Sequence, residues 1–513
     1  MQYYEEVIVK KVLCLTIAIV LLLTTFILIS CKDQSDENVF DSLTDTEKAE
    51  YLSQKSDEYF SSGSVEEASI ILSMTGRMAG IEIANKSTAT QTITKIYPET
   101  DQFQYLSIDN TTSSTKANGV EESEVYTKID GFTGEYMLSG YLSDKDDPVY
   151  LKSRCNVEEY KAYLDEQAAG TPDMETIERN SIVTVTEDES GMYYVVVYTD
   201  LNETAKNEIE SWIQTITSPI DATFVLDSFE MTYTVSKETL SLEIATMTMN
   251  FVTEGSLETE LTMSVAVESK FTFPNLDVDL KPENYDEYSS TSDLRYRYYA
   301  KDRLKKLIES NDMSLMLQTK VQVKGTQGNI TQELYNYKET DTMNYGTLGS
   351  GLFAYHITAD ISATQSDDYD LEISYDGRSQ SLAQNGKMVQ TVAQSQSEAK
   401  SFISSTMAPF SFTEQSVTKI TVFKSDDSTV KATLFFNADE SVRASFQGLG
   451  LTSGNITNAS VKITVIFDEN LEIISAEYAI SGVRTTQGIA YTMTQTATIK
   501  DIGKADISMF SEE

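Results

Sequence analysis

The feature that most constrains the fold of this chain is an internal duplication. Three segments of the first half recur in the second half in the same order, at offsets of 246, 237 and 232 residues. They pair Ile129-Asp130-Gly131 with Tyr375-Asp376-Gly377, residues 194–203 with residues 431–440, and residues 229–235 with residues 461–467. Offsets that drift this little are typical of loops that changed length. The repeat therefore predicts two copies of one domain.

Each copy follows the same order of predicted elements. Apolar residues at helical spacing open the copies, with Ala49 and Leu52 in the first and Ala300 and Leu304 in the second. Long strands follow, and an Asp-Gly pair between them predicts a tight hairpin, because such a turn needs residues that tolerate positive φ. Two further helices come next. The N-caps expected for the second of them are Asn202 and Asp439.

The copies close with long strands in which apolar residues alternate with polar ones, as in Leu240, Leu242 and Ile244. Such alternation is typical of an antiparallel sheet with one face packed and the other in water. The predicted fold class is α+β, with two tandem domains that each pack a large curved antiparallel sheet on a few helices. The domains are expected at 44–280 and 294–513, with a polar tether at 31–43 before them and a linker at 281–293 between them.

The N-terminal residues have the features of an export signal. Lys10 and Lys11 precede an uncharged apolar run, residues 12–30, which ends in Leu28-Ile29-Ser30-Cys31 and turns abruptly polar. The last four residues match the bacterial lipobox, which predicts a signal peptide at 1–30, cleavage between Ser30 and Cys31, and lipid on the Cys31 thiol. The alternative is an uncleaved helix, since 19 apolar residues can just span a bilayer. We expect translation to start at Val9, because Glu5 and Glu6 do not suit a signal.

These residues predict the location of the mature protein, at the extracytoplasmic face of the cell membrane through lipid on Cys31. The net charge of −41 argues against nucleic acid as a partner, because phosphates are bound by clustered Lys and Arg. One His and three Cys leave little for metal sites or nucleophilic triads. Cys14 leaves with the signal and Cys31 takes the lipid, so no disulfide is expected around Cys155.

No group of residues forms a recognisable catalytic, cofactor-binding or metal-binding set, and we expect no enzyme and no cofactor. His356 lies on the strand face opposite its apolar neighbours and is expected to face solvent. The glycines of residues 346–351 lack the lysine of a phosphate loop. The acidic pairs at residues 144–146 and 367–368 are interpreted as solvated loops, and Cys155 as a semi-buried structural cysteine. Tyrosine-rich runs at 193–194 and 296–299 are interpreted mainly as packing, with ligand contact as the alternative.

The lipobox at Leu28–Cys31, the polar tether, the leading helix, the long sheet and the inserted helices together resemble the LolA/LppX-like bacterial lipoproteins. The resemblance covers nearly the whole mature chain twice, and it is one of plan, with only the lipobox matching residue by residue. It implies a half-open barrel over helices in each domain, with an apolar cavity for acyl chains or other hydrophobic ligands. LolA itself is soluble, whereas this chain is predicted to be tethered.

Three functions follow as hypotheses. The preferred one is a membrane-anchored lipoprotein that binds a lipid or other hydrophobic molecule in an apolar pocket and performs no chemistry. The alternative is a structural or interaction protein of the cell surface, an adhesin or spacer, that engages a protein partner through exposed sheet edges. An enzyme acting on an extracellular polymer through paired carboxylates would need two such groups facing each other across a cleft.

Overall fold

The computed structural model describes residues 40–504, except 79–80, 118–119, 169–171, 173, 218–222, 255–258, 274–279, 365–366 and 426–427. The signal peptide, Cys31 and most of the tether lie outside the described residues. The chain divides into two compact units, Met1–Ser289 and Ser290–Glu513. Among the described residues, none of the helices combines the length and the apolar character needed to cross a membrane.

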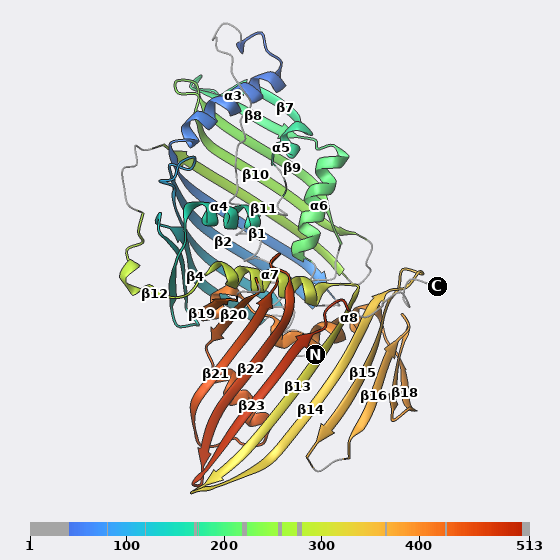
Figure 1. The fold of residues 1–513 in the computed structure, drawn as a ribbon. Coiled ribbons are helices and arrows are strands. Elements are labelled where there is room, and N and C mark those ends of the chain that lie inside the picture. Colours follow the sequence, from blue (N-terminus) through green and yellow to red (C-terminus); the bar gives the residue numbers. More distant parts are fainter. Residues whose placement is uncertain are drawn as a thin grey trace. The chain divides into compact units, whose positions relative to one another are not determined.

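The first unit is mostly sheet, with helices inserted at three places (Figure 1). Its helices are α3 (Asp45–Phe60), α4 (Val157–Ala168), α5 (Met174–Arg179) and α6 (Glu203–Thr217). Its strands are β1 (Gly63–Met78), β2 (Ile81–Ile96), β3 (Gln104–Ala117), β4 (Val120–Phe132), β5 (Tyr136–Ser143), β6 (Val149–Arg154), β7 (Ile182–Glu187), β8 (Tyr193–Thr199), β9 (Thr223–Ser236), β10 (Leu242–Glu254) and β11 (Thr259–Thr272). A short 3-10 helix, η2 (Tyr285–Glu287), and a two-residue strand, β12 (Ser289–Ser290), lie in the region expected as linker.

The second unit repeats this order with shorter helices. Its helices are α7 (Arg295–Glu309), α8 (Gln396–Thr406) and α9 (Asp439–Gly448), with 3-10 turns η3 (Ala408–Phe410) and η4 (Glu414–Ser416). Its strands are β13 (Met313–Gln327), β14 (Ile330–Thr347), β15 (Phe353–Ala363), β16 (Tyr369–Tyr375), β17 (Ser379–Gln384), β18 (Lys387–Ala393), β19 (Val417–Lys424), β20 (Val430–Phe436), β21 (Asn455–Phe467), β22 (Ile473–Thr486) and β23 (Ile489–Lys500).

The two sheets have the same strand order. The first runs β12-β6-β5-β4-β3-β2-β1-β11-β10-β9-β8-β7, and the second runs β18-β17-β16-β15-β14-β13-β23-β22-β21-β20-β19. Apart from β12, each strand of one sheet has a counterpart at the same place in the other. In both units the first and last long strands pair with each other, as β1 with β11 and β13 with β23. The structure thus contains two large antiparallel sheets with a few helices. This agrees in outline with the predicted fold class.

Alternation of buried and exposed residues explains why these segments form long strands. In β2 every second residue from Ile81 to Ile93 is buried and the residues between them are exposed. A sheet with one packed face and one wet face produces this period of two. We call the face against which the helices pack the inner face. Of the alternating residues used to predict a strand, Leu242 and Ile244 lie in β10 and Leu240 precedes it.

Two local predictions were wrong. The Asp130-Gly131 pair lies inside strand β4, and the turn falls at Gly134, whose φ is 89°. In the second unit the prediction was right, since Gly377 lies in the turn after β16 with a φ of 91°. Asp439 is the first residue of α9 and does not cap it, and the N-cap residue, Ala438, provides no side-chain hydrogen bond. By contrast, Asn202 caps α6 as predicted, with Oδ1 accepting from the backbone N–H of Thr204 and Ala205.

The core of the first unit fills the inner face of β1 and β9–β11 beneath α3 and α6. Rows of apolar side chains cross these strands in register, such as Leu72 opposite Val265 and Val265 opposite Met249. Helix α6 adds Ile209, Trp212 and Ile213, all buried in the same cluster. Close packing of this kind leaves each buried side chain surrounded by others.

Candidate functional site

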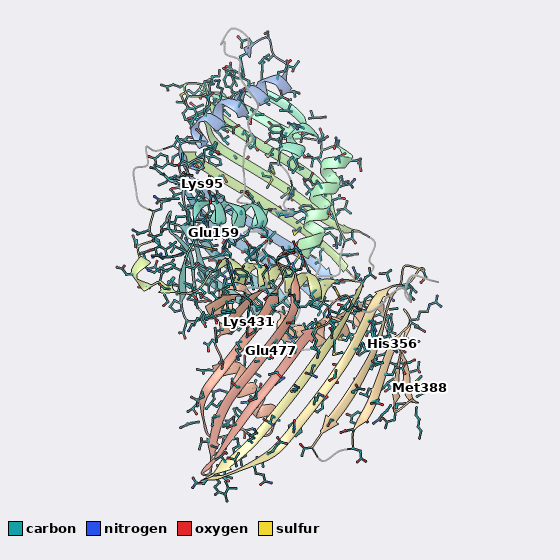
Figure 2. All side chains as sticks on the ribbon, viewed as in Figure 1. Lys95, Glu159, His356, Met388, Lys431 and Glu477 are labelled. Atoms are coloured by element: carbon teal, nitrogen blue, oxygen red, sulfur yellow. The ribbon has the colours of Figure 1, made fainter. Side chains whose placement is uncertain are left out.

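Ser30 and Cys31 lie outside the described residues, and the other sequence-predicted candidates considered below have ordinary structural places. His356 lies on the outer face of β15, and its Nε2 is 2.9 Å from Glu372 Oε1 (Figure 2). Cys155 is buried just before α4, and its thiol donates to the backbone carbonyl of Asn156. The acidic pairs at 144–146 and 367–368 are exposed in loops, as interpreted from the sequence. Among the described residues no group of three or more His, Cys, Asp or Glu is placed to hold a metal ion.

The tyrosine-rich runs serve packing. Tyr296 and Tyr299 of α7 are buried and meet edge to face with ring centroids 5.6 Å apart. Tyr194 of β8 packs against Phe40, with ring centroids 4.7 Å apart. Both positions lie within the helix and strand contacts of their own unit. These contacts agree with the packing interpretation for Tyr194, Tyr296 and Tyr299.

A set of buried polar residues that sequence reasoning missed lines the inner face of β2, β3 and β4 in the first unit. We call it the polar band, and it comprises Asn85, Ser87, Gln91, Ser107, Asp109, Thr111, Ser113, Thr115 and Glu124. Burial of polar groups is unfavourable unless they are hydrogen-bonded. Several of them bond to one another, as Asn85 donates to Thr115 at 2.6 Å and Gln91 donates to Ser107 at 3.2 Å.

The polar band also carries charge. Gln91, Asp109 and Lys128 lie opposite one another across β2, β3 and β4. Burial raises the pKa of Asp109 to about 6, although nearby Lys128 opposes the shift. Lys128 also forms an ion pair with Asp130. This side of the first unit therefore carries buried polar and charged side chains, of which only some are hydrogen-bonded to one another.

The second unit differs on its inner face. Five apolar or aromatic side chains there are only partly buried, namely Val321, Tyr337, Leu371, Ile373 and Tyr478, and we call this set the apolar strip. Val321 and Tyr337 lie directly opposite each other on β13 and β14. In the first sheet the equivalent strands are β1, β2, β4 and β10. Apolar side chains on the inner face of β1 and β10 are buried in the core, whereas β2 and β4 carry part of the polar band. The apolar strip is the main contrast between the two units.

Helix length explains the contrast. In the first unit α6 has 15 residues and the short helix α5 adds Ile177 to the core. In the second unit the equivalent helix, α9, has 10 residues, and 3-10 turns take the place of a helix after α8. Helix α9 buries Val442 and Phe446 against Val323, Val461, Ile480 and Met493. Beside this cluster, the row of Val321 and Tyr337 is only partly buried.

A carboxylate pair borders the apolar strip. Asp341 and Glu339 alternate along β14 with Tyr337, so all three share the inner face. The hydroxyl of Tyr337 donates to Glu339 at 2.8 Å. Burial raises the pKa of Asp341 to about 7, and the neighbouring charge of Glu339 adds to the shift. The arrangement offers apolar contact next to hydrogen-bond acceptors, which is the usual make-up of a site for an amphipathic molecule.

Comparisons with known proteins give no family. No family model matches the chain, and no curated protein matches it. Among solved structures the chain is similar to LprF from Mycobacterium bovis, at 12% identity and a TM-score of 0.22, covering 41% of this chain and 93% of that one. It is also similar to intact Ap-TbpB with its N and C lobes, at 7% identity and a TM-score of 0.14, covering 85% and 76%.

A third similarity is to the translocator domain of the autotransporter NalP from Neisseria meningitidis, at 6% identity and a TM-score of 0.13. It covers 91% of this chain and 98% of that one. At these TM-scores none of the three likenesses supports an argument about function. The resemblance in plan to LolA/LppX-like lipoproteins therefore stays a prediction from the sequence.

Proposed function

We propose that this protein is a membrane-anchored, extracytoplasmic lipoprotein that binds a molecule with an apolar chain and performs no chemistry. Lipid on Cys31 provides the anchor in this proposal, and the inner face of the second unit's sheet provides the binding surface. The first unit, whose inner face is filled by its core and by the polar band, binds no ligand in this proposal. The lipobox, Leu28–Cys31, supports the anchor.

The observation that carries the proposal is the apolar strip. Apolar side chains left half-exposed on the helix-bearing face of a sheet lose part of the free energy that burial would give, about 25 cal/mol for each Å² that stays in water. Val321 and Tyr337 pair across β13 and β14, and Leu371 and Ile373 share the inner face of β16. Partly exposed apolar side chains on one face of a sheet favour a surface that something else covers. Acyl chains suit it, because the strip offers aliphatic contact from Val321, Leu371 and Ile373 and broad aromatic faces from Tyr337 and Tyr478.

The proposal is tested with the mature chain from Lys32, which lacks the lipid-bearing cysteine. Binding of the neutral probe N-phenyl-1-naphthylamine is followed by its fluorescence, and bound lipids are identified by native mass spectrometry and organic extraction. Val321→Lys should abolish probe binding, because it places a charge in the strip. Gln322→Lys is the matched control, since the next residue of β13 lies on the outer face. A wild-type chain that binds no probe and carries no extractable lipid would contradict the proposal.

A second candidate function, self-association on the cell surface, is favoured by edge strand β18. All seven of its residues are exposed, including Met388, Val389 and Val392. Residues 377–397 contain no Asp or Glu in a chain with 80 of them. Charged residues on an edge normally prevent strand pairing between molecules. Edge strand β18 has one charged residue, Lys387 at its first position, and the six residues after it are uncharged.

The sequence of β18 suits pairing with a second copy of itself. In an antiparallel pair centred on Gln390, Met388 lies opposite Val392 of the second copy, and the two Lys387 residues lie at opposite ends. Gln390→Lys would place two like charges face to face and should abolish a dimer, measured by light scattering after size exclusion. Thr421→Lys, on the other edge strand β19, is the control. A wild-type chain that stays monomeric at high concentration would exclude this function.

A further inference from the structure

Asp341 occupies an unusual place in the second sheet. Its neighbours across the strands are Ala359 on β15 and Leu317 on β13, and Leu317 in turn lies opposite Ile499 on β23. The row continues to Ala476 on β22. These four neighbours are buried and apolar. A single carboxylate thus stands in the middle of an apolar row that crosses five strands.

The carboxylate has no partner among the described residues. Asp341 is 7% exposed. No hydrogen bond or ion pair within the described part of the chain reaches its oxygens. The oxygens of Asp341 are not among the fully buried atoms without a partner, so they still reach solvent. A carboxylate that is largely buried without a hydrogen bond or a counter-charge is nevertheless unfavourable. We therefore expect a group from outside the described residues to pair with the Asp341 carboxylate when the protein functions.

The surroundings indicate what kind of group that is. The charged residue nearest along the inner face is Glu339, whose like charge disfavours ionisation of Asp341. Glu339 is half-buried and already accepts a hydrogen bond from Tyr337. Residues two apart on a strand are about 7 Å apart. One cationic group between the two carboxylates can therefore reach both.

We propose that Asp341 and Glu339 bind the ammonium group of an amphipathic ligand whose apolar chain lies along the apolar strip. This inference rests on the proposed function and names the class of ligand. A primary ammonium has three donors and a positive charge, so it can bond to both carboxylates. The chain then extends past Val321 and Tyr337 toward the β13 and β14 ends that lie near α9.

Three probes with the same chain test the inference on the full mature protein from Lys32. Dodecylamine, dodecanoate and dodecanol are titrated, each below its micelle concentration, against bound N-phenyl-1-naphthylamine. Dodecylamine should displace the probe at a concentration at least about tenfold lower than either of the others, a difference of about 1.4 kcal/mol. Asp341→Asn should remove most of that preference, and Glu339→Gln should reduce it.

Asp360→Asn is the matched control, because Asp360 is exposed on the outer face of β15 next to Ala359. Probe binding without competitor and the circular dichroism spectrum report whether each variant is folded. Equal displacement by the three compounds, or a preference for dodecanoate, would overturn the inference and leave the proposed function standing. Failure of the wild-type chain to bind the fluorescent probe at all would instead remove the proposed function itself.

Discussion

At the scale of single residues, burial decides the properties of the charged groups. Asp341 and Asp109 are both buried, and burial raises the pKa of each carboxyl well above its ordinary value. Asp109 has hydrogen-bond partners in the polar band, whereas Asp341 has none in the described part of the chain. Both residues are aspartates within strands, so the difference in their hydrogen bonding comes from the residues that surround them.

The raised pKa of Asp341 predicts a dependence of stability on pH. In the unfolded chain the carboxyl loses its proton near pH 4, but in the folded chain it holds the proton up to about pH 7. Stability from this group is therefore complete at acid pH and falls as the pH rises toward 7, by on the order of 4 kcal/mol. Asp341→Asn should raise the midpoint of urea unfolding at pH 8 and change it little at pH 4.

The measurement is urea unfolding followed by far-ultraviolet circular dichroism at both pH values. Asp360→Asn, on the exposed face of the neighbouring strand, should change neither midpoint. An Asp341→Asn variant that is less stable than the wild type at pH 8 would show that the carboxylate has a partner in the folded chain.

Residue patterns predicted some of these positions and missed others. His356, Cys155 and the acidic loop pairs were placed correctly, because strand alternation or flanking polar residues marked their surroundings. The polar band was missed because both faces of β3 are polar, with Ser113 buried and Thr112 exposed beside it. Alternation cannot show which of two polar residues faces inward. Asp341 gave no signal either, since an Asp beside Glu339 and Lys338 looks solvated in the sequence.

At the scale of elements, helix length controls how much of each sheet is covered. Helices α6 and α9 take equivalent places between equivalent strands, and both bury apolar residues against their sheet. Helix α6 is longer and has a side-chain N-cap, whereas α9 has none. The N-cap satisfies backbone N–H groups that the first turn of a helix leaves without partners.

The cap of α6 gives a second prediction. Asn202→Ala removes the acceptor for the backbone N–H of Thr204 and Ala205 and should lower the free energy of unfolding by about 1 kcal/mol. Trp212, the only tryptophan, lies in α6, so its fluorescence in urea reports on this unit. Asn437→Ala, just before α9, should leave the tryptophan signal unchanged. If Asn437→Ala lowered the free energy of unfolding measured by tryptophan fluorescence as much as Asn202→Ala does, the capping role of Asn202 would be contradicted.

The packing of α9 gives a third prediction. Phe446 is fully buried between α9 and the strands, so Phe446→Ala should cost about 3–5 kcal/mol in unfolding free energy. Phe423 on edge strand β19 is exposed, and Phe423→Ala should cost less than about 0.5 kcal/mol. Hydrogen exchange at the amides of β21 and β22 checks both variants. If these amides were equally protected from exchange in the Phe446→Ala and Phe423→Ala variants, α9 would contribute little to the stability of the second unit.

At the scale of the whole molecule, two similar units carry different inner faces. The strand order is the same in both, so the sheet by itself does not determine where a ligand binds. In the proposed function the inserted helices and the polar band make the difference, because they cover or fill the inner face of the first unit. We therefore expect binding from the second unit and structural support from the first.

The anchor is a prediction that belongs to the whole molecule. Cys31→Ala should abolish palmitate labelling of the protein in cells and release it from the membrane fraction, because Cys31 is the predicted acceptor of lipid. Cys155→Ala should keep the label, since that thiol is buried beside α4. Labelling that persists in Cys31→Ala would show that the lipobox is not used.

The sequence by itself determined the order of the elements, the alternation of the long strands and the presence of two related halves. Those features follow from local periodicity and from a repeat, and both are visible along the chain. Only the tertiary structure decided which polar residues face inward, how far each helix covers its sheet, and that Asp341 stands alone among apolar neighbours. These features depend on which strands become neighbours, and Asp341 lies in the same row as Leu317 and Ile499 only through the pairing of β14 with β13 and of β13 with β23.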